Sequence, residues 1–153
     1  MKKIIVLAVS TFFGVGFLPL IPGTFGSIAG LSVYFLLKNS GINYLLFTCI
    51  LIIIGFISSN AAEVILKKKD ASCIVIDEVS GILLSLMFLP YDLRLVVIGF
   101  FLFRIMDTLK PFPAGRLQNL KGGLGVMSDD IVAAIYTNII LQVVLRLASL
   151  RIS

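Results

Sequence analysis

Long apolar stretches separated by short polar segments are the feature that most restricts how this chain can fold. We expect helices at residues 27–37, 42–62, 74–89, 93–109 and 131–149. An apolar helix crosses a bilayer with about 20 residues, so most of these stretches approach the required length. Charged residues make up only 14% of the sequence, whereas soluble domains contain roughly 25%. The sequence therefore predicts an all-α fold, an integral membrane helical bundle with four to five membrane segments.

The N-terminal segment is less regular than the rest. Residues 4–20 are apolar but contain Gly14, Gly16 and Pro19, which predicts a short embedded or interfacial helix in place of a complete crossing. Prolines and glycines in residues 19–27 predict an irregular loop, so we expect the next helix to begin at about Ser27. The chain is too short for an additional soluble domain, and we expect a single membrane-embedded domain over residues 1–153.

Basic residues occupy the polar segments between the apolar stretches. Lys67, Lys68 and Lys69 fall in one segment, and Arg116 and Lys121 fall in another. Lysine-rich and arginine-rich loops are typical of the cytoplasmic side of a membrane. The net charge is +5, but the basic residues form no stripe with interleaved aromatic residues, so no nucleic acid is expected as a partner. We therefore expect a multi-pass membrane protein with these loops in the cytoplasm.

Acidic residues gather at the edges of the apolar stretches. Five of the eight lie there: Asp77, Glu78, Asp107, Asp129 and Asp130. A charged side chain at bilayer depth costs roughly 2.5 kcal/mol or more, so acids in such places usually serve a function. If the apolar stretches form antiparallel hairpins, these acids return to the same cytoplasmic end. The chain contains no histidine, and carboxylates alone suit a hard metal ion.

Two basic residues accompany the acids. Arg104 and Lys110 lie three residues on either side of Asp107, which places all three on one helix face. Guanidinium and ammonium groups suit an anionic group such as phosphate. A simple ion pair at an exposed helix end would also explain this set.

Other polar residues have structural explanations as well. Asp129, Asp130 or Ser128 would cap a helix that begins after the glycine-rich turn. Thr24 or Ser27 would mark a helix start, although their hydroxyls and nearby amides also suit a phosphate group. These alternatives stay open on the sequence alone.

Several catalytic arrangements are excluded. Without histidine there is no Ser/His or Cys/His nucleophile pair. A cysteine-phosphatase loop would place arginine a few residues after Cys73, but Val79 occupies that position. The P-loop nucleotide motif is also missing. Cys49 and Cys73 are the only cysteines, which argues against a disulfide framework or a zinc site.

Short motifs in a fixed order carry a family resemblance. They are Pro22-Gly23-Thr24-Phe25-Gly26-Ser27, Asp70 followed by Ile76-Asp77-Glu78 and Gly81, Phe103-Arg104 followed by Asp107 and Lys110-Pro111, and Gly122-Gly123-Leu124-Gly125-Val126-Met127-Ser128-Asp129-Asp130-Ile131-Val132-Ala133. In these motifs the chain resembles the phosphatidylglycerophosphatase A family of bacterial membrane phosphatases, from about Gly14 to Ala134. Ala134 departs from the family pattern, which has glycine there; the change affects a helix contact and leaves the chemistry untouched.

The resemblance implies an enzyme of phospholipid biosynthesis, a Mg²⁺-dependent phosphoric monoester hydrolase. It would convert phosphatidylglycerophosphate to phosphatidylglycerol and phosphate at the inner face of the bacterial cytoplasmic membrane. Asp77, Glu78, Asp107, Asp129 and Asp130 would hold one or two Mg²⁺ ions, which acidify an attacking water. Direct attack by an aspartate remains open. The substrate-binding residues would be Arg104, Lys110 and Lys121 at the phosphoryl oxygens, with Thr24 and Ser27 as lesser contacts.

A small ion transporter or channel component is the rival hypothesis from another class. Buried acids and cations would then form an ion path and should lie near the middle of membrane spans. Here they lie at the ends of the predicted spans, which favours the enzyme. A structural membrane subunit is a third hypothesis, but it leaves the paired acids unexplained.

Overall fold

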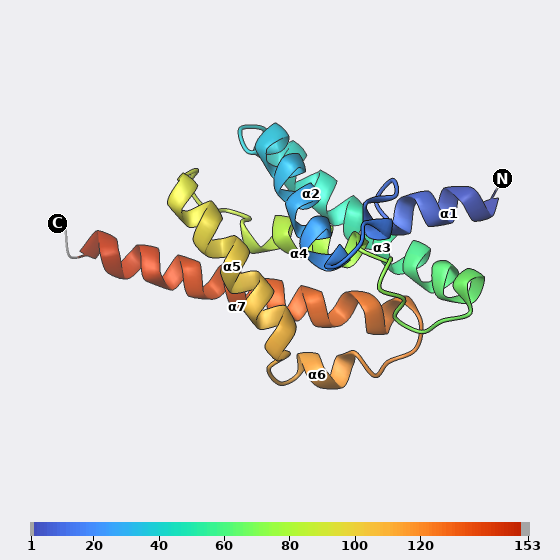
Figure 1. Cartoon of the computed structure of the whole chain (residues 1–153). Helices are drawn as coiled ribbons and strands as arrows, with labels where there is room; N and C mark the ends of the chain where they lie inside the picture. The colour runs from blue at the N-terminus through green and yellow to red at the C-terminus, as the bar shows by residue number, and fades with distance from the viewer. Residues whose placement is uncertain (1, 151–153) are drawn as a thin grey trace.

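Helices make up the whole regular structure of the described part of the chain. The computed structural model describes residues 2–150, which form seven α-helices and one 3₁₀ turn (Figure 1). In chain order these are α1 (Lys2–Ser10), η1 (Val15–Phe17), α2 (Pro22–Leu37), α3 (Ile42–Leu66), α4 (Ile76–Ser85), α5 (Leu93–Leu109), α6 (Ala114–Leu117) and α7 (Gly123–Leu150). The all-α prediction is confirmed.

Two helices have the length and composition of bilayer spans. These are α3, with 25 residues, and the Gly123–Ala148 portion of α7, with 26 residues. At 1.5 Å per residue each extends for about 37–39 Å, which exceeds the roughly 30 Å of a hydrocarbon core. The helices α2 and α5 are apolar but shorter, with 16 and 17 residues. Within residues 2–150 the structure thus shows two candidate spans, and the four to five that the sequence predicts are not shown.

The short helix α4 lies at the centre of the fold. It packs against α2, α3, α5 and α7, and eight of its ten residues are buried (Figure 1). The sequence predicts a membrane segment over 74–89, but a ten-residue helix is only about 15 Å long and cannot cross a bilayer. Its hydrophobicity therefore reflects burial in protein. Hydropathy alone does not distinguish that environment from lipid.

Side chains from the two long helices, α3 and α7, donate hydrogen bonds to carbonyl groups at the C-terminal end of α4. Asn138 of α7 donates from Nδ2 to the carbonyl oxygens of Ser85 and Met87, at 3.0 and 2.8 Å. The Tyr44 hydroxyl of α3 donates to the carbonyl oxygen of Leu83. The last carbonyls of a helix lack partners within it, so these bonds allow α4 to end inside the molecule.

Glycines let neighbouring helices approach α4 closely. A Cβ atom on Gly30 of α2 would lie 2.3 Å from Ile82 Cγ2 and 2.8 Å from the carbonyl oxygen of Val79. On the other side, a Cβ atom on Gly81 would lie 2.5 Å from Cζ of Phe103 in α5. Larger residues at these positions would push α2 and α5 away from α4.

Several helix boundaries differ from those that the sequence predicts. The helix α5 has the predicted bounds, whereas α3 continues past residue 62 to Leu66. The helix α2 begins at Pro22, not at about Ser27, because proline is well suited to the first helical position, where no amide donor is needed. The first segment forms α1 and η1, and α1 packs against α3.

The last helix begins at Gly123, not at residue 131. Gly122, with φ of +64°, makes the turn before it. A Cβ atom on Gly123 would lie only 2.0 Å from the carbonyl oxygen of Phe56 in α3. The glycines that predict a loop therefore allow a helix to start in close contact with α3.

Candidate active site

Three carboxylates from two helices meet in the interior. Asp77 and Glu78 lie in the first turn of α4, and Asp130 lies in α7. One carboxylate oxygen from each lies within 4.8 Å of the others. Asp77 is 7% exposed and Asp130 is 4% exposed. The helix packing of α4 against α7 thus brings together residues far apart in the sequence.

These three acids have oxygens without a partner. Among the described residues, Oδ1 of Asp77, Oε2 of Glu78 and Oδ2 of Asp130 are buried and accept no hydrogen bond. Buried carboxylates placed side by side are costly unless a cation compensates for them. Their oxygens are the ligands that hard divalent cations prefer. The donor set therefore fits a metal ion.

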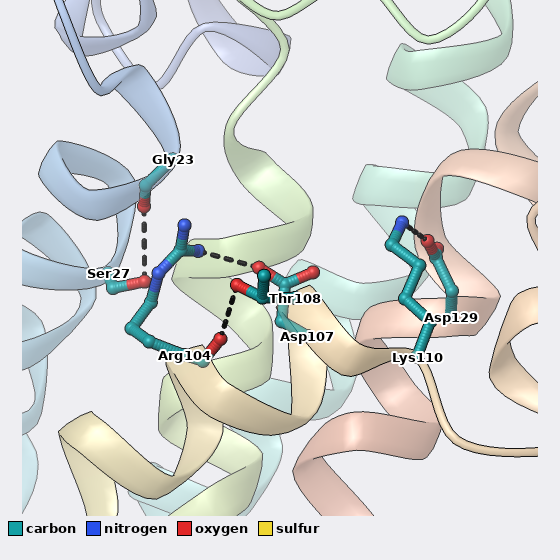
Figure 2. Close-up of polar contacts among 7 residues, drawn as sticks. All are labelled: Gly23, Ser27, Arg104, Asp107, Thr108, Lys110 and Asp129. Atoms are coloured by element: carbon teal, nitrogen blue, oxygen red, sulfur yellow. Dashed lines mark hydrogen bonds and ion pairs between the residues drawn. The ribbon is translucent and has the colours of Figure 1, made fainter.

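Asp129 forms an ion pair with Lys110 beside this cluster. The Lys110 ammonium donates to Oδ2 of Asp129 from the C-terminal end of α5, while Oδ1 of Asp129 is buried without a partner within residues 2–150 (Figure 2). Burial lowers the pKa of the Lys110 ammonium, but the hydrogen bond and charge of Asp129, with the charges of Asp107 and Asp130, outweigh burial and raise it. Lys110 is therefore held as a cation beside the acids.

Arg104 and Asp107 form the other edge of the site. Nη1 of Arg104 donates to Oδ2 of Asp107 at 2.8 Å, within the last turns of α5 (Figure 2). This is the local ion pair that the three-residue spacing predicts. The pair also faces the cluster, because Asp107 interacts electrostatically with Glu78 and Asp130, and Arg104 interacts with Glu78. The ion-pair explanation is therefore confirmed for Arg104 and Asp107, while phosphate binding by Arg104 stays a prediction.

Gly23 is a site residue that the sequence reasoning did not single out. A Cβ atom at this position would lie 2.3 Å from Oε1 of Glu78 and 3.2 Å from Nη2 of Arg104. The N-terminal end of α2, where backbone amides give a partial positive charge, therefore borders the acids directly. The Pro22-Gly23 pair is the sequence signal that could have identified Gly23. A proline at the first position of a helix places the glycine after it in the first turn.

The remaining predicted residues lie around the site at different distances. Ser27 is fully buried, and its hydroxyl donates to the carbonyl oxygen of Gly23 at 3.1 Å (Figure 2). Thr24 is half-buried in the first turn of α2. Lys121 is exposed and lines a cavity of about 440 Å³ with Phe56, Ile57, Asn60, Gly123 and Leu124. None of the interactions described for residues 2–150 joins Lys121 to the acids.

The helix-cap explanation of Asp129 and Asp130 does not hold. Both residues lie well inside α7, which begins at Gly123. Each is 4% exposed. Neither Asp is positioned at the start of the helix, so their burial needs another reason, and the adjacent lysine and acids provide one.

Together these features define a class: an apolar helical protein whose buried carboxylates fit a metal ion and whose flanking cations fit a phosphate group. Residues 8–145 match the family model for phosphatidylglycerophosphatase A. The chain belongs to the phosphatidylglycerophosphatase A family, which is a family of lipid phosphatases. The resemblance in the motifs is thereby confirmed over most of the chain.

Relatives from three bacteria are similar to this chain, and two of them carry the family's name. Phosphatidylglycerophosphatase A of Escherichia coli is 37% identical over 126 residues, covering 80% of this chain and 73% of the relative. The protein of the same name from Haemophilus influenzae is 35% identical over 132 residues, covering 84% and 81%. A Bacteroides thetaiotaomicron protein, whose name gives it provisionally as a phosphatidylinositol-3-phosphatase, is 36% identical over 146 residues, covering 88% and 90%. No solved structure matches the chain.

Proposed function

We propose that the protein is a Mg²⁺-dependent phosphatase that hydrolyses phosphatidylglycerophosphate to phosphatidylglycerol and inorganic phosphate. The observation that carries this proposal is the gathering of unpartnered oxygens from Asp77, Glu78 and Asp130 beside Arg104 and Lys110. The two relatives named phosphatidylglycerophosphatase A support the choice of lipid.

The acids have distinct positions in this proposal. Asp77, Glu78 and Asp130 would hold the ion, and Asp129 would add its free oxygen. Asp107 would join them from the end of α5. Mg²⁺ bound by these carboxylates would neutralise negative charge on the phosphate and make a water molecule more acidic.

The cations would orient the phosphate. Arg104 uses one nitrogen for Asp107, and Lys110 uses one proton for Asp129, so both keep donors for phosphoryl oxygens. The amide-rich N-terminal end of α2 at Gly23 and Thr24 would add positive potential. Ser27 and Lys121 would make lesser contacts, since the first is bonded within its own helix and the second lies in the cavity beside α3.

The proposed orientation in the membrane rests on where the acids and the basic segments lie. The acids lie at the first turn of α4, the last turn of α5 and the N-terminal part of α7, close to the lysine-rich segment 67–69 and to Lys121 in the sequence. We place this end of the molecule at the cytoplasmic face of the inner membrane. Asp77, Glu78 and Asp107 lie at helix ends, and Asp129 and Asp130 lie in the N-terminal third of α7; these positions favour an enzyme over an ion path through the middle of the bilayer.

A second lipid substrate comes from the Bacteroides relative. Its name specifies the 3-phosphate of phosphatidylinositol, and it matches this chain over 90% of its own length. That substrate is also a phosphomonoester on a lipid headgroup, so the same metal and cation arrangement would act on it. Headgroup choice then depends on residues around Arg104 and Lys110.

Phosphate release from pure lipids distinguishes the two substrates. We would purify the protein in detergent and measure phosphate released from phosphatidylglycerophosphate and from phosphatidylinositol 3-phosphate, with Mg²⁺ or with EDTA. We expect release from the first lipid that stops in EDTA and returns with excess Mg²⁺. Faster release from the second lipid would replace the proposed substrate, and no release from either would contradict the proposal.

The matched variants are Asp130→Asn and Asp92→Asn. Asp130→Asn should lower the rate by more than about 100-fold, because even outer-shell partners of a metal are worth about 10- to 100-fold. Asp92→Asn removes the same charge at the other end of α5, where the side chain caps the helix by accepting from the Arg94 amide, and asparagine also caps well. It should leave the rate unchanged.

A further inference from the structure

One face of α5 carries a shallow apolar hollow. Its volume is about 340 Å³, and it is lined by Phe101, Arg104, Ile105, Thr108 and Leu109. These residues recur at spacings of three and four, so they share one side of the helix. Phe101, Ile105 and Leu109 are 60%, 50% and 70% exposed. The hollow is therefore an open apolar surface.

Arg104 connects this hollow to the acidic site. Its Nη1 donates to Asp107 at 2.8 Å, and its Nη2 lies near Gly23 at the start of α2. Figure 2 shows the side chain extending from α5 toward Gly23. The Thr108 hydroxyl donates to the Arg104 carbonyl oxygen at 2.8 Å, which satisfies that polar group within the helix. The apolar wall of the hollow, which includes the stem of Arg104, thus leads to the guanidinium that contacts the site.

Two other hollows lack this connection. The one between α1 and α3 is lined by Ile5, Val6, Val9, Ile54, Ile57, Ser58 and Ala61. The cavity beside Lys121 is lined by residues of α3 and by residues around the start of α7. Neither includes Arg104 or any of the five acids. Among these three hollows, the α5 hollow is the one that includes a residue in contact with the acids, namely Arg104.

We propose that the α5 hollow holds the first part of an acyl chain of the phospholipid substrate, with Arg104 at the junction between chain and headgroup. This inference rests on the proposed lipid phosphatase function. Phe101, Ile105 and Leu109 contact methylene groups, and Arg104 contacts phosphate oxygens while its stem lies along the apolar wall. The face of α5 thereby selects for a substrate that has acyl chains.

Filling the hollow tests this proposal. We would compare the wild-type protein with Ile105→Trp on a long-chain substrate in mixed micelles and measure kcat and KM separately. Ile105→Trp should raise KM by about fourfold for each methylene group that loses its contact, with kcat unchanged, because the indole occupies the space of the chain. Ile105→Ala, which removes contacts without adding bulk, should also raise KM.

Ile53→Trp on α3 is the matched control. Ile53 is 59% exposed, similar to Ile105, and lines none of the hollows described above. It should leave KM unchanged, and all variants should keep the unfolding temperature of the wild type. A wild-type KM in both Ile105 variants, with normal activity, overturns this inference but leaves the proposed function intact. Absence of phosphate release from any lipid by the wild type overturns the proposed function, and this inference with it.

Discussion

The Lys110–Asp129 ion pair joins the end of α5 to the interior of α7. The Asp129 side chain is 5% exposed and that of Lys110 is 26% exposed, so the carboxylate is the more buried partner. Removing only the cation would leave a buried carboxylate with neither of its oxygens paired. Breaking one side of such a pair costs more than replacing both sides.

The variant Lys110→Gln should therefore lower the free energy of unfolding by about 2 kcal/mol, in the range for hydrogen bonds to charged groups. The double variant Lys110→Gln with Asp129→Asn should be more stable than Lys110→Gln alone, because the unpaired charge is gone. Thermal unfolding in detergent measures both effects. A double variant that is as unstable as the sum of the two single variants would show that the pair is not coupled.

Gly23 provides a second prediction at this scale. Alanine is a better helix former than glycine by about 1 kcal/mol, so local propensity favours Gly23→Ala. The added Cβ atom, however, would meet Oε1 of Glu78 at 2.3 Å and displace that carboxylate. We expect phosphate release to fall by more than about tenfold, since a displacement of 1 Å in a catalytic site can cost about 100-fold.

The unfolding temperature of Gly23→Ala serves as the control. It should change little, because improved helix propensity offsets the shift of one side chain. Full activity in this variant would show that the position of Glu78 does not affect phosphate release, which would contradict the place of Glu78 in the proposed site.

At the scale of the helices, α4 depends on its neighbours. It is too short to be stable alone, and its last carbonyls rely on Asn138 and Tyr44. The same helix carries Asp77 and Glu78 at its other end. Support at the C-terminal end of α4 therefore fixes the position of the acids about two turns away.

The variant Asn138→Ala should destabilise the protein by about 1–3 kcal/mol, because it leaves the Ser85 and Met87 carbonyls unsatisfied in the interior. Metal-dependent activity should fall as well. The matched control is Gln142→Ala, since Gln142 donates to Asn138 Oδ1 at 2.7 Å but forms no described bond to α4. Equal effects of the two variants on unfolding temperature would contradict this role of Asn138.

The sequence predicted the helices whose signals are local and strong. Helix α5 has the predicted bounds because Asp92 caps its start and Pro111 follows its end. The predicted starts of α2 and α7 were wrong, because Pro22 and Gly123 are residue types that also occur in loops. Both helix starts pack closely in the structure, Gly23 beside Glu78 and Gly123 beside the Phe56 carbonyl, and such contacts are not visible in a single sequence.

Much of the candidate site could be predicted from the sequence, because its residues are charged and the chain is mostly apolar. Charges are rare in this chain, so acids within apolar stretches stand out, and hairpin reasoning brought Asp77, Glu78 and Asp130 together as the structure does. The separate position of Lys121 was not predictable, because it depends on how α3 packs against the start of α7. The shortness of α4 was also missed, since a buried core helix and a membrane helix have similar composition.

At the scale of the whole molecule, α3 separates two polar segments. It extends for about 37 Å, with Asn39 just before its start and Lys68 just after its end. If α3 crosses the bilayer, these residues lie on opposite faces. Both side chains are exposed, so both positions can be labelled.

We predict that Asn39→Cys reacts with a membrane-impermeant maleimide in intact spheroplasts, and that Lys68→Cys reacts only after the membrane is disrupted. Cys49 and Cys73 would first be replaced by serine. Labelling measures the orientation directly. Reaction of Lys68→Cys in intact spheroplasts would place the acidic end of the molecule outside the cytoplasm.

The acids come from helices that are made at different times. Asp77 and Glu78 emerge with α4, before Asp129 and Asp130, which belong to α7, the last helix within residues 2–150. A ribosome-bound or truncated chain that lacks α7 holds only part of the carboxylate cluster and no partner for Lys110. The carboxylate cluster can therefore form only after the first turns of α7 have been made and have packed against α4.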